Sequence, residues 1–251
     1  MAARVERLLA AALGGDPHVN LNVKAAELLA DAGSVALAIS GVLERAGPGL
    51  APQLRLSQTL QSAGLVEDLL NALANPDPNV RIAAARLCGA LRMTDSLPWL
   101  ADMVADSRPR VWEAAVRALG ELGGRRAVDV LMSAADRIPQ HRLAIELARA
   151  ASDMDIEALM REPASVQAAV ITVLACGLRH DNLRVGPLSA IAQDRRWPSR
   201  VRTAACRSLA MIGDTSTSVA LARLTSDPDA GVKGAALDAQ KRLHRAGAER
   251  A

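Results

Sequence analysis

Residues 77–91 read DPNVRIAAARLCGAL, and this stretch decides the fold. Its apolar residues recur at the i, i+3, i+4, i+7 spacing of one buried helix face: Val80, Ala83, Ala84, Leu87 and Leu91. Asp77 and Pro78 suit the first turn of a helix, because Asp caps free N–H groups and Pro lacks the N–H that would have no partner there. The stretch therefore predicts an amphipathic helix that begins near Pro78.

Prolines at similar helix starts recur about every 30 residues, with one shifted step, which indicates an internal repeat. They are Pro17, Pro48, Pro78, Pro109, Pro139, Pro163, Pro198 and Pro228. A break, often with Gly or Asp, follows each predicted first helix, and a second short amphipathic segment comes next. The predicted second helices are 34–45, 64–74, 95–105, 125–135, 153–160, 184–193 and 215–225. Each unit is therefore a helical hairpin.

The pattern Asp-Pro-x-x-Val-(Arg/Lys)-x-Ala-Ala, followed by Leu-x-x-(Leu/Ile)-Gly, resembles a HEAT repeat of the short kind found in phycobilisome lyase-like proteins. The closest stretches are 77–105, 106–135 and 198–225. The resemblance implies an all-α protein, a right-handed α-α superhelix (a HEAT/armadillo-like solenoid) of about eight helical-hairpin repeats. We expect one solenoid over 1–245, with 1–15 as an N-terminal helix or cap and 246–251 as a flexible tail.

The composition of the chain and its lack of catalytic motifs argue against an enzyme or a membrane protein. The chain has no P-loop, nucleophile elbow, metalloprotease motif or dinucleotide fingerprint, and its four histidines are scattered. We therefore expect no catalytic residue, no metal and no cofactor. The three cysteines form no CxxC pair, which favours buried thiols in a reducing compartment, and we expect a cytoplasmic protein without a membrane span.

The predicted second helices carry 5 basic and 9 acidic residues, although the whole chain has a net charge of +3. In this fold the second helices usually line the concave surface, so the sequence predicts an acidic binding face. We expect a protein or peptide partner, in particular a basic one. The candidate residues are Asp95, Trp99, Asp102, Trp112, Asp129, Asp153 and Asp155. Trp99 is expected to turn partly outward, and Trp112 stands where other repeats carry Arg or Lys.

Basic residues gather between 179 and 207, which indicates a possible second site for an acidic partner. Its candidates are Arg179, Arg184, Arg195, Arg196 and Arg200. A separate column of basic residues follows the repeat, and it includes Arg81, Arg202 and Lys233. The family resemblance implies that these side chains contact an Asp near the turn of an adjacent repeat, so we assign them a structural role.

The leading hypothesis is a non-catalytic scaffold or adaptor that binds a protein or peptide on its concave face. The first alternative is a HEAT-like DNA-binding protein or alkylpurine DNA glycosylase. We do not expect nucleic acid, because phosphate binding needs cations where this face is acidic, and stacking aromatics are scarce. The second alternative is a bilin-lyase-like chaperone subunit, for which the sequence shows no Cys/His arrangement.

Overall fold

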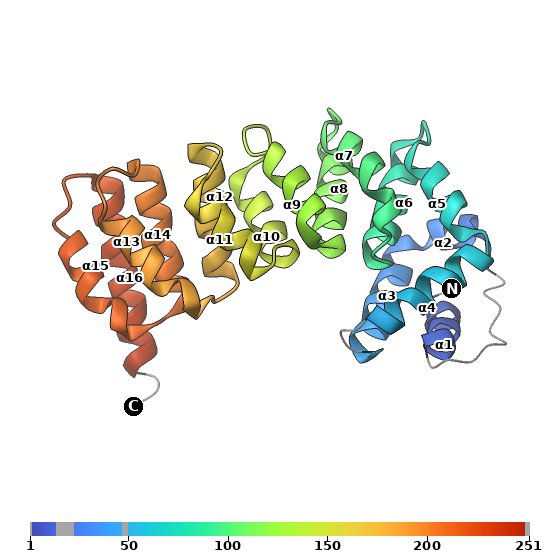
Figure 1. Cartoon of the computed structure of the whole chain (residues 1–251), viewed down its shortest axis with the longest axis horizontal. Coiled ribbons are helices and arrows are strands. Elements are labelled where there is room, and N and C mark those ends of the chain that lie inside the picture. Colours follow the sequence, from blue (N-terminus) through green and yellow to red (C-terminus); the bar gives the residue numbers. More distant parts are fainter. Residues whose placement is uncertain (1, 14–22, 47–49, 249–251) are drawn as a thin grey trace. The chain divides into compact units, whose positions relative to one another are not determined.

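The computed structural model describes residues 2–13, 23–46 and 50–248. Within these ranges every element of regular secondary structure is a helix, which confirms the all-α prediction (Figure 1). By contacts the chain divides into unit 1, Met1–Val130, and unit 2, Leu131–Ala251. None of the described helices is both long enough and apolar enough to cross a membrane.

Four of the six ladder prolines that the structure describes lie at helix starts, whereas Pro163 and Pro228 lie in the loops before the helices that begin at Val166 and Ala230. Pro78 and Pro109 lie in the first turns of α6 (Pro78–Ala90) and α8 (Pro109–Leu122). Asp77 caps α6 by accepting a hydrogen bond from the N–H of Asn79. Pro139 and Pro198 are the N-caps of α10 (Gln140–Ala150) and α14 (Ser199–Ile212). Pro17 and Pro48 lie outside the described residues.

Unit 1 contains two rows of helices. In the first row α3 (Ala32–Ala46) packs against α6, and α6 packs against α8. The second row holds α5 (Leu65–Leu73) and α7 (Leu97–Val104), which contact α6 and α8 respectively (Figure 1). The remaining helices are α1 (Ala2–Leu13), α2 (Ala25–Ala30), α4 (Leu50–Ser62), the short η1 (Thr94–Ser96) and α9 (Gly124–Ser133), which extends past Val130.

The position of α3 corrects one prediction. The sequence assigned 34–45 to the second helices, but α3 contacts α6 in the way that α6 contacts α8, so it belongs to the first row. Its Arg45 forms an ion pair with Glu6 of α1 at 2.6 Å and does not contribute to a second-helix face.

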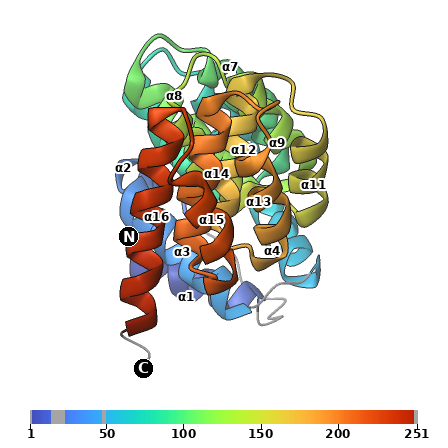
Figure 2. The same ribbon diagram turned by 90° about the vertical axis from the view of Figure 1, so that its left-hand side faces the viewer.

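Unit 2 repeats the two-row plan. Its first row is α10, α12 (Val166–Leu178), α14 and α16 (Ala230–Ala248), each packed on the next. Its second row is α11 (Asp153–Arg161), α13 (Val185–Gln193) and α15 (Ser218–Leu224), seen beside the first row in Figure 2. The 3-10 turns η2 (Asn182–Arg184) and η3 (Thr215–Thr217) precede α13 and α15. The helix α16 includes residues 246–248, which the sequence placed in a tail.

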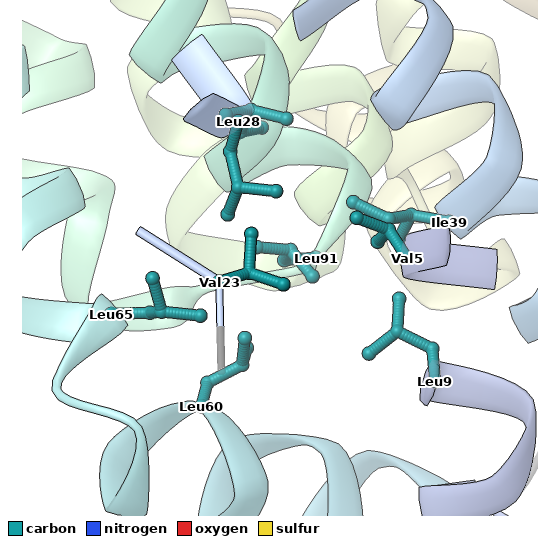
Figure 3. A pocket seen from close by; sticks show the side chains of 9 residues that line it. Val5, Leu9, Val23, Leu28, Ile39, Leu60, Leu65 and Leu91 are labelled. Atoms are coloured by element: carbon teal, nitrogen blue, oxygen red, sulfur yellow. The ribbon is translucent and has the colours of Figure 1, made fainter. Parts of the chain in front are cut away.

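Aliphatic side chains fill the cores, and a small cavity of about 20 Å³ remains among the N-terminal helices of unit 1 (Figure 3). Every side chain that lines it is aliphatic, including Leu9, Leu28 and Leu60. Apolar cavities of this size stay dry and offer no polar group to orient a ligand. The cavity is therefore a packing defect and no candidate for a functional site.

Candidate functional site

Four exposed carboxylates lie on the second row of unit 1, and we call them the acidic face: Glu67, Asp68, Asp95 and Asp102. Two come from α5, one from η1 and one from α7. In the described part of the chain none of the four has a hydrogen bond or ion pair through its side chain. Their negative charge is therefore available to an external partner. The sequence predicted Asp95 and Asp102 individually, and Glu67 and Asp68 as part of the acidic second helices.

Trp99 lies within the same row. Leu100, Met103 and Val104 are the buried side of α7, and Trp99 itself is half-buried, which agrees with the predicted partly outward orientation. Leu69 of α5 is buried like Leu100, so Asp68 occupies in its helix the place that Trp99 occupies in α7. A half-buried indole beside exposed carboxylates combines an apolar surface with negative charge.

Two other predicted residues, Asp129 and Trp112, differ from the residues of the acidic face in their pairing or in their helix row. Asp129 of α9 is exposed, but its Oδ1 forms an ion pair with Nε of Arg125, one turn earlier, at 3.0 Å. Trp112 is half-buried on α8, a first-row helix that packs against α7, whereas the acidic face lies on α5, η1 and α7.

The acidic residues predicted on α11 are engaged in structural contacts. Asp155 is buried and forms a capping box, in which its carboxylate accepts hydrogen bonds from the N–H and Oγ–H of Ser152 at 3.0 and 2.7 Å. Asp153 is paired with the guanidinium of Arg179. The prediction that Asp155 belongs to a binding surface is wrong, because burial in a helix cap removes it from the surface.

Three of the five residues of the predicted basic site, Arg179, Arg184 and Arg196, form structural contacts within the chain. Besides binding Asp153, Arg179 donates to the carbonyl of Ala151, while Arg184 donates to the carbonyl of Asp153 at 3.0 Å. The guanidinium groups of Arg179 and Arg184 therefore stabilise the N-terminal end of α11 by hydrogen bonds. Arg196 forms a bidentate pair with Asp194, and this guanidinium holds the pKa of Asp194 below its ordinary value.

Only Arg195 and Arg200 of that predicted cluster are exposed without a described hydrogen bond or ion pair. Arg200 belongs to a larger set of exposed cations on the first-row helices α14 and α16 for which no ion pair is described. They are Arg200 and Arg207 on α14, and Lys233, Lys241 and Arg242 on α16. The signal that locates them is helical spacing, since Arg200 and Arg207 are two turns apart on one exposed side.

The column of basic residues performs the structural role that the resemblance implied at two positions. Arg81 pairs with Asp106 of the next repeat at 2.8 Å, and Arg202 pairs with Asp227. The N–H of Arg108, together with Arg81, holds the pKa of Asp106 below its usual range, and Arg202 does the same for the buried Asp227. Lys233 is exposed and makes no such contact in the described part of the chain.

The three cysteine thiols are buried and carry no reactive thiolate. Cys88, Cys176 and Cys206 are free and buried, and burial raises their pKa values to about 12, 11 and 11. Thiols in this state are packing groups with no nucleophilic thiolate at neutral pH. Among the described residues no group of three or more His, Cys, Asp or Glu side chains is arranged to hold a metal ion.

The sequence also matches a known family of repeat proteins. A model of HEAT repeats matches residues 66–151 and 155–240, which together are more than half of the chain. The chain belongs to the HEAT-repeat family. The match covers the acidic face and most of the first-row helices of both units, so the candidate site is built from HEAT repeats.

Solved structures that this chain resembles include human deoxyhypusine hydroxylase in complex with glycerol, at 17% identity and a TM-score of 0.38, with 97% of this chain and 98% of that chain covered. They also include a designed armadillo repeat protein in complex with the peptide (KR)4, at 16% identity and a TM-score of 0.31, with 97% and 99% covered. No curated protein matches the sequence significantly. Similarity at this level carries no inference about function.

Proposed function

We propose that this HEAT-repeat protein is a non-catalytic scaffold whose acidic face binds a basic segment of a protein partner. The supporting observation is that Glu67, Asp68, Asp95 and Asp102 are exposed and unpaired, whereas the acidic residues of α11 are neutralised or buried. A row of neighbouring helices offers an extended surface of the kind that binds peptides and helices. Its buried, unpaired cysteines support a location in a reducing compartment such as the cytoplasm.

The energetics assign different roles to the carboxylates and the indole. An exposed ion pair contributes about 0.2–1 kcal/mol, so the four carboxylates together contribute on the order of 1–4 kcal/mol. Charges at this level chiefly select the sign of the partner and accelerate association. Trp99 supplies apolar area, and Trp is enriched among residues whose removal costs the most binding energy. We therefore assign selection to the acidic face and anchoring to Trp99.

The test is fluorescence anisotropy with a labelled peptide rich in lysine and leucine, measured over a range of salt concentrations. The variant Asp95→Lys/Asp102→Lys should bind about 10- to 100-fold more weakly, because it removes two attractive charges and adds two repulsive ones. A matched control is Asp136→Lys/Asp238→Lys, which changes the net charge equally at two exposed positions of unit 2. The variant Trp99→Ala should weaken binding with little change in its salt dependence.

The control decides between a site and a general charge effect. Equal losses in the two double variants would show that the peptide responds to net charge alone, and the acidic face would lose its role. Absence of wild-type binding at low salt would reject a basic partner at this face.

A further inference from the structure

A groove of about 250 Å³ opens on the first-row side of unit 1, between α3 and the pair α6 and α8. On α3 its lining residues are Gly33, Ala36, Leu37 and Ser40, whose spacing places them on one side of that helix. On the other side it is lined by Arg86 of α6 and by Arg117 and Glu121 of α8. The groove is on a different row from the acidic face.

Small residues on α3 produce the hollow. A Cβ added to Gly33 would find no heavy atom within 4 Å, so the space beside it is open. On the α6–α8 side the helices meet tightly, since a Cβ on Gly89 would lie 2.7 Å from the Cα of Ala118. The opening is therefore confined to the boundary between α3 and its neighbours.

The groove combines positive charge with exposed apolar surface. Arg86 is exposed, and the described part of the chain gives its guanidinium no hydrogen bond or ion pair. Arg117 donates from Nε to Oε1 of Glu121 at 3.0 Å and remains 58% exposed. Two cations and one carboxylate leave one positive charge without compensation. Leu37 is 71% exposed at the edge, a large fraction for a leucine in a helix packed on its neighbours.

We propose that this groove binds an acidic peptide segment in which a carboxylate side chain stands next to an aliphatic one. The carboxylate pairs with Arg86, helped by Arg117, and the aliphatic side chain covers Leu37 and fills the space over Gly33. Burial of Leu37 and of the incoming side chain stabilises the complex by the hydrophobic effect, and a guanidinium–carboxylate pair fixes the register.

Charge and size disfavour other occupants. A phosphate group carries up to two negative charges, so the Glu121 carboxylate inside the groove repels it more strongly than it repels a single carboxylate. The phosphate would also leave Leu37 uncovered. The volume is below the roughly 300–1,000 Å³ of sites for small organic ligands, so it suits one or two side chains of a longer chain. This inference goes beyond the proposed function, because it concerns a second partner of opposite charge on the other row.

The experiment selects peptides from a random-sequence display library against the full-length protein. The acidic face should select basic peptides, and we expect a second class of selected peptides that share an Asp or Glu adjacent to a Leu, Ile or Val. The affinities of this second class would then be measured by fluorescence polarisation for Arg86→Glu and Gly33→Leu. Each variant should bind at least about tenfold more weakly, because one reverses the recognising charge and the other fills the groove. Gly33→Leu should keep the native melting temperature, since the added side chain meets open space and Leu favours the helix.

Two controls separate this site from its surroundings. Arg110→Glu makes the same charge change at an exposed position of α8 outside the groove, and it should alter affinity by less than about twofold. Asp95→Lys/Asp102→Lys should leave the acidic class of selected peptides bound, so failure of the acidic-face proposal and failure of this one give different results. Absence of an acidic class among the selected peptides, or unchanged binding of that class to Arg86→Glu and Gly33→Leu, would each overturn the proposal.

Discussion

Replacing Gly177 by alanine tests how closely α12 and α14 pack. Gly177 is buried on α12, and a Cβ there would lie 2.8 Å from the Cα and 2.9 Å from the Cβ of Ser208 on α14. It would also lie 2.5 Å from Cε of Met211, but that flexible end can move aside. The backbone at Ser208 cannot move without displacing α14, so the two helices must separate.

The expected cost follows from three contributions. Alanine gains about 1 kcal/mol of helix propensity over glycine. Overpacking costs about 1–3 kcal/mol. Separation also strains the buried hydrogen bond in which Oγ of Ser208 donates to the carbonyl of Val173 at 2.8 Å, and leaving such a group unsatisfied costs about 1–3 kcal/mol. With each range taken at its midpoint, the balance is a destabilisation of about 3 kcal/mol.

Thermal unfolding followed by circular dichroism measures this balance. At about 2–4 °C per kcal/mol for a chain of this size, Gly177→Ala should lower Tm by about 6–12 °C. Gly234→Ala is the matched control, because Gly234 lies inside α16 with no heavy atom within 4 Å of an added Cβ. It should raise Tm by about 1–4 °C through helix propensity alone. A stabilised Gly177→Ala protein would refute the close packing of α12 on α14.

Two further predictions concern contacts that hold the repeats. Asp227→Asn leaves Arg202 buried without a counter-charge, so it should destabilise the protein by about 3–5 kcal/mol at pH 7. Because the folded pKa of Asp227 lies below its unfolded value, this difference should shrink as pH falls below about 4, and a pH-independent difference in urea unfolding would contradict the ion pair. Ser152→Ala removes the capping box of α11 and should cost about 1 kcal/mol by the same measurement; no loss would show that Asp155 caps the helix unaided.

The sequence predicts the helices well because prolines mark the starts of many first helices and the apolar spacing of each helix marks its buried face. Pro78, Pro109, Pro139 and Pro198 all stand in the first turn or at the cap of a helix. The row of α3 was not predictable, because periodicity gives the buried side of a helix without naming the neighbour that covers it. Its correct place depends on contacts with α6, a helix more than 30 residues further along the chain.

For the candidate site, too, the sequence predicts which charged residues are exposed but not which of them are paired across repeats. Exposure of Asp95 and Asp102 followed from helical spacing, but the neutralisation of Asp153 did not, since Arg179 stands 26 residues away and reaches it across a repeat. Arg81 and Asp106 were anticipated only through the family resemblance. The structural role of Asp155 could have been predicted from the sequence, because Ser152, three residues earlier, completes a capping-box pattern at the start of a helix.

The burial of the three thiols makes them reporters of local opening. A thiol of raised pKa inside a packed helix does not react with an alkylating reagent until the helices around it separate. Cys88 lies in unit 1, whereas Cys176 and Cys206 lie in unit 2 on α12 and α14. Mass-resolved alkylation under native conditions therefore follows each unit separately, without any introduced label. Equal alkylation rates at all three thiols would mean that the repeats open in one cooperative step. A different alkylation rate at Cys88 would mean that unit 1 and unit 2 open independently.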